Sequence, residues 1–406
     1  MSTVAILHFT APPVVGGVES VIDHHARMLV AAGHSVRVIA GRGQATDRRI
    51  TFEHIPLLDS LHSRVLTAKQ VLDADQVPAQ WQNLVTDIRT RLQDALVDVD
   101  VVFAHNVASL HKNLAFTTAL FELSQQPDAP RVVLWHHDIA WDSQRYGHEM
   151  HAGMPWDLLR MAWPNTTQVT ISSARQKELA QLLTLPVEDI IVIPNGVSPR
   201  LFLKLGHMSI ALVNSLNLME ASPLLLMPVR LTGRKNIELA LHSLAELHTH
   251  MPEARLLITG PLGPHNPANE KYLASLKALR SELKLETHAH FLVEQVSGFI
   301  PDEVISDFYH LADALLLPSK DEGFGIPVLE AGLAGIPVFC SNIPALQELG
   351  GEEANYFSPE ADPKGVAALI HTTLISSQVW RLRNRVRQQY SWQQIYNQHL
   401  APLVAE

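Results

Sequence analysis

The sequence predicts an α/β protein with two doubly wound domains, each built on a parallel β-sheet. Its 406 residues are too many for one ordinary hydrophobic core. Continuous apolar runs recur along the chain with helical patterns between most of them, which is typical of parallel strands covered on both faces. The alternation weakens over residues 199–222 and then restarts, which indicates two domains.

Six apolar runs predict the strands of the first domain. They are "VAILHF" (4–9), "SVRVIA" (35–40), "VDVVFAH" (99–105), "RVVLWHH" (131–137), "QVTISS" (168–173) and "IIVIPNG" (190–196). After the first run, apolar residues recur at helical spacing from Val18 to Leu29, and Gly33 is a typical helix terminator. This pattern predicts a strand, a loop and a helix at the start of the chain.

The second half repeats the same alternation. Strands are predicted at "PLLLMPVR" (223–230), "ARLLITG" (254–260), "HAHFLV" (288–293), "DALLLPS" (313–319) and "IPVFCS" (336–341), and a helix at "NIELALHSLAELHTHM" (236–251). We therefore expect a first domain over residues 1–205 and a second over 206–379, with 199–222 as the linker. The last helical stretch, about 380–406, could pack back onto the first domain. Because open parallel sheets bind ligands at the carboxyl ends of their strands, two such domains predict a cleft between those edges.

The composition narrows the functional class. The formal charge of −10 and the pI of about 6.1 give no general electrostatic footprint for nucleic acid. The only cysteine, Cys340, cannot form an internal disulfide, which suits a reducing compartment. The N-terminus lacks a basic region before its apolar stretch, and no run approaches the roughly 18 apolar residues of a membrane span. We expect a cytoplasmic protein with at most peripheral membrane contact, and its oligomeric state stays open.

The most informative stretch is "DEGFGIPVLEAGLAGIPVF", residues 321–339. Gly323 and Gly325 predict a loop that lets backbone approach a ligand closely, and Pro327 suits the first position of a following helix. The free N–H groups at such a helix start bind anions, usually phosphate. Glu330 lies about one turn inside this helix, and Glu322 lies before the loop. One carboxylate can then bind a nucleoside diol and the other a sugar, on opposite sides of a diphosphate.

This stretch resembles the signature of the retaining glycosyltransferases of family four, E-x7-E within E-G-F-G-[IL]-P-x-L-E-A. Further motifs support the resemblance: "GGVE" (16–19), "HHD" (136–138), "IPNGV" (193–197), "RLTGRKN" (230–236), "LLITG" (256–260) and "IPALQELGG" (343–351). The resemblance implies the GT-B fold, with two Rossmann-like domains facing across a cleft. It also implies transfer of a hexose from a nucleotide-sugar donor to a hydroxyl acceptor with retention, without a cofactor or a metal.

The resemblance also implies roles for particular residues. "RLTGRKN" matches the family pattern R-L-x-x-x-K-G, so Arg230 and Lys235 would clamp the donor diphosphate. Two fixed cations can supply the charge neutralisation that other transferases obtain from a divalent metal. The implied catalytic residues are Glu322, His137, Arg230 and Lys235. The implied donor-binding residues are Gly16, Gly17, Arg230, Lys235, Glu322, Gly323, Phe324, Gly325, Ile326, Val328, Leu329 and Glu330.

Several alternatives stay open at the level of sequence. Val293 stands where the family has a glycine before its base-contacting segment, so UDP-, GDP- and ADP-sugars all remain candidates. The acceptor could be a sugar, a glycan, a lipid or a small hydroxylated molecule. His136 and His137 are adjacent, and the sequence does not decide which one faces the substrate. A phosphorylase of similar fold and a non-catalytic protein that binds nucleotide-sugars are the alternative functions.

Overall fold

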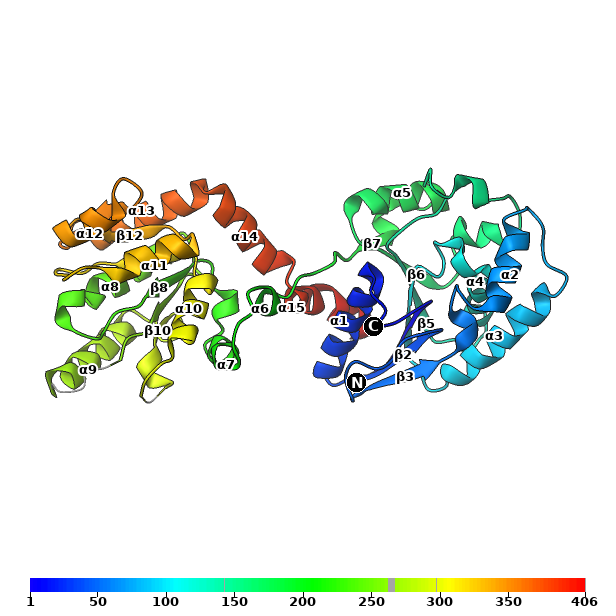
Figure 1. Ribbon diagram of the computed structural model, residues 1–406, viewed down its shortest axis with the longest axis horizontal. Helices are drawn as coiled ribbons and strands as arrows, with labels where there is room; N and C mark the ends of the chain where they lie inside the picture. Colours follow the sequence, from blue (N-terminus) through cyan, green and yellow to red (C-terminus); the bar gives the residue numbers. More distant parts are fainter. Residues whose placement is uncertain (142, 262–266, 297, 406) are drawn as a thin grey trace. The chain divides into compact units, whose positions relative to one another are not determined.

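The computed structural model describes residues 1–141, 143–261, 267–296 and 298–405 (Figure 1). The chain forms two compact units. Unit 1 comprises Met1–Gly196 with Trp392–Glu406, and unit 2 comprises Val197–Ser391. Each unit has an all-parallel sheet with helices on both faces, so the predicted class of two doubly wound α/β domains is confirmed.

Unit 1 contains a seven-stranded sheet with the order β3-β2-β1-β4-β5-β6-β7. The strands are β1 (Thr3–His8), β2 (Ser35–Ala40), β3 (Ile50–His54), β4 (Val101–His105), β5 (Arg131–His136), β6 (Thr166–Thr170) and β7 (Ile190–Val192). The strand order reverses between β1 and β4. The carboxyl ends of β1 and β4 therefore form the switch point at which doubly wound sheets bind their ligands.

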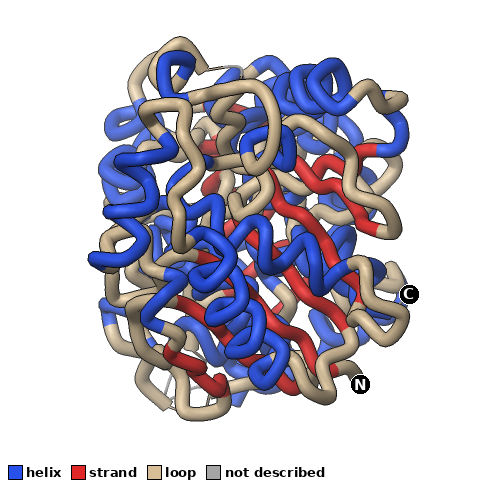
Figure 2. Tube along the Cα trace, turned by 90° about the vertical axis from the view of Figure 1, so that its right-hand side faces the viewer, coloured by secondary structure: helices blue, strands red, loops and turns tan. Residues whose placement is uncertain are grey.

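Helices cover both faces of this sheet, and Figure 2 shows blue helices in front of the red strands. They are α1 (Gly17–Ala31), α2 (Ser63–Leu72), α3 (Trp81–Ala95), α4 (Leu114–Ser124), α5 (Ser173–Leu183), α15 (Trp392–Ile395), the π-helix η9 (Tyr396–Leu400) and α16 (Ala401–Ala405). One apolar core packs α2, α3 and α4 onto the strands, and a second packs α1 with the C-terminal helices. The last residues of the chain thus complete the core of unit 1.

The start of the chain illustrates why these elements form. β1 is buried along almost its whole length, and α1 turns Val21, Ile22 and Leu29 toward the sheet. Gly33 follows the helix with φ +92°, a left-handed backbone conformation that residues other than glycine adopt with strain. The predicted strand, helix and terminator are all confirmed.

Unit 2 contains a six-stranded sheet with the order β10-β9-β8-β11-β12-β13. Its strands are β8 (Leu224–Met227), β9 (Arg255–Ile258), β10 (Ala289–Phe291), β11 (Ala314–Leu317), β12 (Val338–Ser341) and β13 (Asn355–Phe357). Here the order reverses between β8 and β11, which makes the carboxyl ends of these two strands the second switch point.

The helices of unit 2 form two packed groups around one apolar core. They are α6 (Pro199–Phe202), α7 (His207–Ser215), α8 (Ile237–Leu247), α9 (Pro267–Glu282), α10 (Asp302–Leu311), α11 (Ile326–Ala334), α12 (Pro344–Gly350), α13 (Pro363–Ser376) and α14 (Gln378–Gln389). Helix α8 packs with α9 and α13, whereas α10 packs with α7 and α11. The short 3₁₀ turns used below are η7 (Gly233–Lys235) and η8 (Leu292–Glu294).

The prediction of a linker over residues 199–222 is wrong. This segment forms α6, α7 and a 3₁₀ turn, and it buries Leu212, Val213 and Leu218 in the core of unit 2. The segment is rich in apolar residues, but they are divided among two short helices and the 3₁₀ turn, so the sequence shows no single long helical run. The first segment of unit 1 ends at Gly196 and the chain returns to this unit at Trp392, whereas the sequence placed the domain bounds at 205 and 379.

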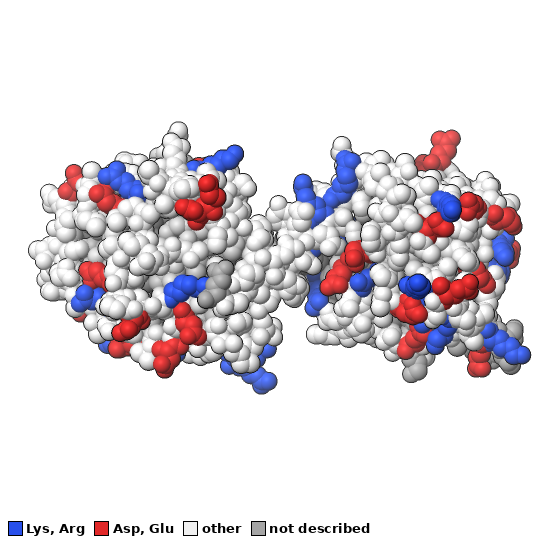
Figure 3. Space-filling view, turned by 180° about the vertical axis from the view of Figure 1, so that it is seen from behind, with Lys and Arg blue, Asp and Glu red and all other residues white. Residues whose placement is uncertain are grey.

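The surface carries both signs of charge. On the face shown in Figure 3, lysine and arginine side chains alternate with aspartate and glutamate side chains over both units. Within the described ranges no helix is long and apolar enough to cross a membrane. The visible face therefore offers no broad basic surface of the kind that nucleic acids require.

Candidate functional site

The loops after β8 and β11 bring together most of the residues singled out in the second half of the sequence. Arg230 and Lys235 follow β8, and Glu322 to Glu330 follow β11. Because β8 and β11 are neighbours in the sheet, their loops meet at the switch point of unit 2. The arrangement is the one expected for a ligand site at the carboxyl edge of an open sheet.

A buried ion pair lies at the centre of this cluster. The ammonium group of Lys235 is hydrogen-bonded to Oε1 of Glu322, and both side chains are about nine-tenths buried. The Ser319 hydroxyl donates to the same Oε1 at 2.7 Å. Burial of two charges is tolerated only when each is paired and hydrogen-bonded, so these contacts fix both side chains in place. Among the described residues, the polar group near Oε2 of Glu322 is the Arg234 guanidinium, at 3.9 Å.

The turn that carries Lys235 departs from the family pattern at Asn236, and the structure explains why the departure is tolerated. Asn236 has φ +55°, in the left-handed region where the family has glycine and where asparagine is the best substitute. Its side-chain amide donates to the carbonyl oxygens of Pro318 at 3.0 Å and Pro359 at 2.9 Å. The asparagine therefore ties the Lys235 turn to the loop after β11.

The two glycines of the loop before α11 have different reasons to be glycine. Gly325 has φ +103°, and a Cβ atom there would lie 2.6 Å from Cδ2 of Leu346. Gly323 has no such constraint, because a Cβ atom there would meet nothing within 4 Å. Packing thus requires glycine at 325, whereas at 323 the chain leaves open space beside the backbone. Pro327 takes the second helical position and not the first, where its missing N–H is equally harmless.

Glu330 is held separately from Glu322. The Tyr309 hydroxyl donates to Oε2 of Glu330 at 2.6 Å, and burial together with this carboxylate raises the pKa of Tyr309. Tyr309 is itself buried on α10, so it sets the orientation of the carboxylate. Among the other predicted donor-binding residues, the side chains of Phe324, Ile326 and Leu329 are exposed. Val328 is buried in the core and can offer a ligand only its backbone.

A second cluster lies at the switch point of unit 1, between β1 and β4. His8 ends β1, His105 ends β4, and His136 ends β5 with His137 directly after it. The predicted residues Gly16 and Gly17 lie at the start of α1, in the loop region that follows β1. The strand order therefore collects the histidines and the glycine loop at one sheet edge.

Hydrogen bonds connect these histidines. Nδ1 of His8 donates to the carbonyl oxygen of His105 at 2.7 Å, and Nδ1 of His105 lies 2.9 Å from Nε2 of His137. Nε2 of His136 points elsewhere, to the side-chain oxygen of Gln168 at 2.8 Å on the next strand. The backbone N–H of His137 donates to the Asn106 side chain at 2.8 Å. His136 is thus tied to β6, and His137 belongs to the cluster at the switch point.

Burial keeps these histidines neutral. It lowers the pKa of His136 and His8 to about 4 and that of His137 to about 3, and it lowers the pKa of His105 well below its ordinary value. Neighbouring histidines lower the pKa of His137 and His105 further. At neutral pH each ring therefore has one donor and one acceptor nitrogen. His8, which donates through Nδ1, has its acceptor nitrogen at Nε2.

Glu19 is a member of this cluster that the sequence reasoning missed. Its Oε1 accepts a hydrogen bond from the Thr10 hydroxyl at 2.5 Å and lies 4.0 Å from Nε2 of His8. A Cβ atom on Gly16 would lie 2.0 Å from Oε2 of Glu19, so the small residue makes room for this carboxylate. The "GGVE" motif contained the signal, because a glutamate three residues after a glycine N-cap lies in the first helical turn.

The geometry divides the predicted site residues between the units. Unit 2 holds Arg230, Lys235, Glu322, Glu330 and the 323–329 loop and helix, and unit 1 holds His137, Gly16 and Gly17. The sequence missed Tyr309, His8 and His105, whose partners are distant along the chain. It also missed Ser319, which lies three residues before its partner Glu322. The roles of all these residues in catalysis and donor binding stay predictions.

Two family models together cover most of the chain. The model for glycosyl transferases group 1 matches residues 210–390, and the model for glycosyltransferase family 4 matches residues 15–201. The chain belongs to glycosyltransferase family 4. The resemblance seen in the sequence is thereby confirmed, and the protein is a glycosyltransferase with the two Rossmann-like domains of the GT-B fold.

Individual relatives of this glycosyltransferase have low sequence identity to it, but their alignments cover most of the chain. It is 25% identical to a mannosylglucosylglycerate synthase from Petrotoga mobilis over 308 residues, 70% of each chain. It is also 25% identical to an MMP alpha-(1->4)-mannosyltransferase from Mycolicibacterium hassiacum, over 98% of this chain and 97% of the relative. A solved structure of sucrose-phosphate synthase from Thermosynechococcus elongatus aligns with 99% of this chain and 98% of its own at 17% identity, with a TM-score of 0.38.

Proposed function

We propose that this glycosyltransferase uses a nucleotide-sugar donor and transfers a hexose to a hydroxyl acceptor with retention of configuration. The donor would bind at the carboxyl edge of β8 and β11. The observation that carries the proposal is the buried Lys235–Glu322 pair, which sets a cation and a carboxylate side by side at this edge. Retention is proposed from membership of the family.

The donor diphosphate would be bound by cations and backbone amides. Lys235 gives one of its N–H donors to Glu322 and keeps others for a phosphate oxygen. Arg230 is exposed beside the same turn, and among the described residues its guanidinium has no ion-pair partner. The start of α11 adds free N–H groups and the positive end of a helix dipole. These groups would stabilise the negative charge that grows on the leaving diphosphate as the glycosidic bond stretches.

The two glutamates would hold the parts of the donor on either side of the diphosphate. Glu322, whose Oε2 makes no hydrogen bond within the part of the chain that the structure describes, would accept from a sugar hydroxyl. Glu330, oriented by Tyr309, would accept from the ribose diol. The open space beside Gly323 would admit the donor close to the backbone. In a same-face reaction, the departing phosphate oxygen takes the proton of the acceptor hydroxyl while that hydroxyl attacks the anomeric carbon.

The relatives suggest the first substrates to test. One is named as a mannosyltransferase and another as a mannosylglucosylglycerate synthase, so we propose hexose transfer and give mannose donors priority. UDP, GDP and ADP remain open as the nucleotide, because Val293 alters the segment that contacts the base in the family. The names of these relatives also lead us to propose a small hydroxylated acceptor.

A donor screen followed by a transfer assay tests this function. Nucleotide-sugars that raise the melting temperature are offered with small polyols and sugars, and NMR reads the anomeric configuration of the product. Arg230→Ala and Lys235→Ala should each reduce turnover by about 10²–10³-fold, whereas Arg234→Ala should have a much smaller effect. Unchanged turnover in the Arg230 and Lys235 variants and in their double mutant would show that the diphosphate is bound elsewhere. An inverted product would reject retention.

A further inference from the structure

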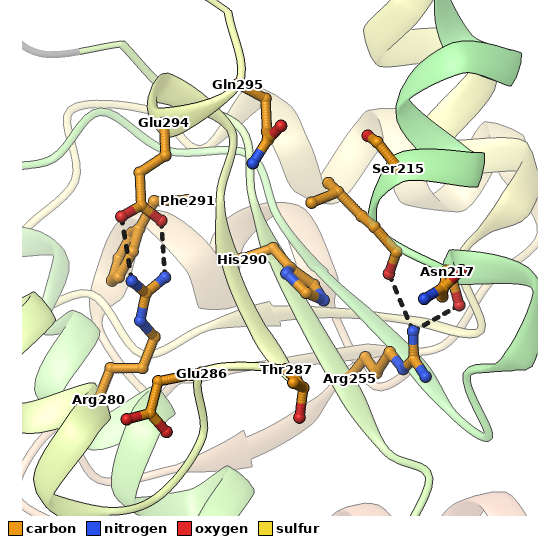
Figure 4. Close-up of a pocket in the computed structure, with 11 residues that line it drawn as sticks. Ser215, Asn217, Arg255, Arg280, Glu286, Thr287, His290, Phe291, Glu294 and Gln295 are labelled. Carbon is orange, nitrogen blue, oxygen red and sulfur yellow. Dashed lines mark hydrogen bonds and ion pairs between the residues drawn. The ribbon is translucent and has the colours of Figure 1, made fainter.

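A second pocket in unit 2 lies apart from the proposed donor site. It has a volume of about 400 Å³, within the range of small-molecule sites. Its lining comes from the end of α7, the first residue of β9, the end of α9, the edge strand β10 and the turn η8 (Figure 4). β10 is the outermost strand, two positions away from β8. None of the residues predicted to bind the donor lines this pocket.

The pocket is built around Arg255 and His290. Arg255 is 7% exposed and His290 is 8% exposed. In Figure 4 the imidazole of His290 lies between the guanidinium groups of Arg280 on one side and Arg255 on the other. Arg280 is neutralised, because both of its terminal nitrogens donate to Glu294, at 2.6 and 3.0 Å. Lys277 adds a second cation to Glu294, at 3.0 Å.

The guanidinium of Arg255 is hydrogen-bonded through one of its edges. Its Nη1 donates to the carbonyl oxygens of Leu216 at 2.9 Å and Asn217 at 2.5 Å, at the end of α7. The opposite edge of the guanidinium, Nε and Nη2, is the edge that binds phosphate or carboxylate in bidentate fashion. Nε is buried without a partner in the described part of the chain, and Nη2 has only the exposed Glu220 carboxylate at 3.6 Å. A buried N–H donor without a hydrogen-bond partner destabilises a fold unless a ligand accepts its hydrogen bond.

The environment of His290 also favours an anionic ligand. Its Nε2 is buried and has no hydrogen-bond partner among the described residues. Burial first, and then the two arginines, lower its pKa to about 4, so the potential at this ring is positive despite the nearby Glu294. Two buried polar atoms, Nε of Arg255 and Nε2 of His290, therefore have no hydrogen-bond partner within the described ranges, and they lie in a positive environment.

The rest of the lining is suited to hydroxyl groups. Glu286 supplies a carboxylate, Thr287 a hydroxyl, and Asn217 and Gln295 supply side-chain amides. A carboxylate accepts hydrogen bonds from sugar hydroxyls and an amide both accepts and donates them, whereas a bare carboxylate repels a simple anion. The combination favours a molecule with an anionic end and a hydroxylated body.

From this geometry we propose that the pocket formed by Arg255, His290 and Glu286 binds a sugar phosphate. The phosphate lies against the Nε–Nη2 edge of Arg255 and Nε2 of His290, and the sugar hydroxyls face Glu286, Asn217 and Gln295. The site is separate from donor binding and does not depend on the proposed reaction. The ligand is noncovalent, so no bond is made or broken.

Titration calorimetry of the full chain with glucose 6-phosphate tests the proposal, with inorganic phosphate, glucose and gluconate as comparison probes. We expect one site per chain for glucose 6-phosphate, weaker binding of inorganic phosphate, and no measurable binding of glucose. His290→Gln and Arg255→Lys should each weaken binding by about tenfold or more, because the first replaces the ring and the second keeps the charge but loses the fork. His288→Gln is the matched control, since His288 is the neighbouring histidine and does not line the pocket.

Four results would overturn the proposal. They are no binding of glucose 6-phosphate at millimolar concentration, equal binding by His290→Gln and His288→Gln, loss of binding when a nucleotide saturates the donor site, and gluconate binding tighter than glucose 6-phosphate. Circular dichroism of each variant checks that it is folded. If Arg255→Lys does not fold, because Arg255 also caps α7, His290→Gln alone decides the matter. Failure of donor binding would leave this test unaffected, so the two proposals can fail independently.

Discussion

Glu322 and Glu330 lie on either side of the glycine loop, and each has a different partner. Glu322 is paired with Lys235 and Ser319, whereas Glu330 accepts from Tyr309. Under the proposed function they also contact different parts of the donor. Interactions that are alike in the ground and transition states affect KM, and those that strengthen in the transition state affect kcat. Removing the charge of Glu322 and removing that of Glu330 should therefore change different kinetic parameters.

We expect Glu330→Gln to weaken both the free nucleotide and the donor, mainly as a raised KM, because the ribose is bound alike throughout the reaction. Glu322→Gln should lower kcat while the free nucleotide binds nearly normally. Calorimetric affinity for the nucleotide is measured beside donor kinetics. Tyr309→Phe serves as a control, since it should change the same parameters as Glu330→Gln by a smaller factor. If Glu322→Gln abolishes nucleotide binding and Glu330→Gln only slows turnover, the two assignments are reversed.

Alanine substitutions at Gly323 and Gly325 can distinguish a glycine needed for packing from one needed for close approach of the ligand. Gly325→Ala should destabilise the fold by about 1–3 kcal/mol, because alanine is strained at φ +103° and its Cβ would clash with Leu346. Gly323→Ala should leave the free energy of unfolding within about 0.5 kcal/mol but weaken donor binding. Denaturant unfolding and donor titration of both variants provide the measurement. Normal donor affinity in folded Gly323→Ala would argue against close approach of the donor there.

At the scale of elements, a buried ion pair is among the contacts that join α14 to the rest of unit 2. The Arg387 guanidinium donates to Asp313 Oδ2 at 2.5 Å and to the carbonyl oxygen of Ala221 at 3.0 Å. The other side of Asp313 Oδ2 accepts from the backbone N–H of Leu224, at the start of β8. This network joins the last helix of the unit to its first strand.

Arg387→Ala should therefore destabilise unit 2 by about 3–5 kcal/mol, since it leaves the Asp313 carboxylate buried without its principal partner. Arg385→Ala, two residues earlier on the exposed side of α14, should change the free energy of unfolding by less than about 0.5 kcal/mol. Chemical denaturation followed by circular dichroism compares the two variants. Equal stability of both would mean that the buried pair contributes nothing.

The sequence predicted the buried strands well and the exposed ones poorly. The edge strands β3 and β13 were missed, because their half-exposed patterns give no continuous apolar run, whereas the edge strands β7 and β10 were found. Long apolar runs such as that of β11 were found because strands buried on both faces need continuous apolar residues. Helices α6 and α7 were mistaken for a linker, since both are short and their apolar residues acquire partners only from the folded core.

The candidate site follows the same rule. The loop and helix around Glu322 to Glu330 could be predicted because their turn chemistry is local. The pairing of Lys235 with Glu322 joins residues 87 positions apart, and only the neighbouring positions of β8 and β11 bring them together. His105 gave no signal in the sequence for a similar reason, because its partner His137 is 32 residues away, directly after the next strand.

At the scale of the whole molecule, the proposed chemistry relies on side-chain cations. Arg230, Lys235 and the α11 amides would neutralise the leaving diphosphate without a divalent ion. Among the described residues there is no group of three or more metal-ligating side chains. We expect transfer to continue at an unchanged rate after exhaustive EDTA treatment. Loss of activity on chelation, restored by added Mg²⁺ or Mn²⁺, would contradict this expectation.

The two units should also respond differently to acid. Unit 1 buries His8, His25, His105, His136 and His137, and desolvation lowers the pKa of each. A group whose pKa is lower in the folded state than its value of about 6.5 in the unfolded chain is neutral in the fold and takes up a proton on unfolding. The resulting stability is fully present above pH 6.5 and is lost as the pH falls toward the folded-state pKa. Each such histidine contributes a slope of at most about 1.4 kcal/mol per pH unit.

Unit 1 should therefore lose stability steeply between pH 7 and pH 5, before the carboxylates begin to titrate. Tryptophan fluorescence measures this directly, because six of the seven tryptophans lie in unit 1 and only Trp380 lies in unit 2. His25→Phe keeps a ring against Trp135 and Trp392 but removes one titrating group, so its denaturation midpoint should fall less over this interval than that of the wild type. A midpoint that stays constant from pH 7 to pH 5 would show that these histidines are not buried in the neutral form.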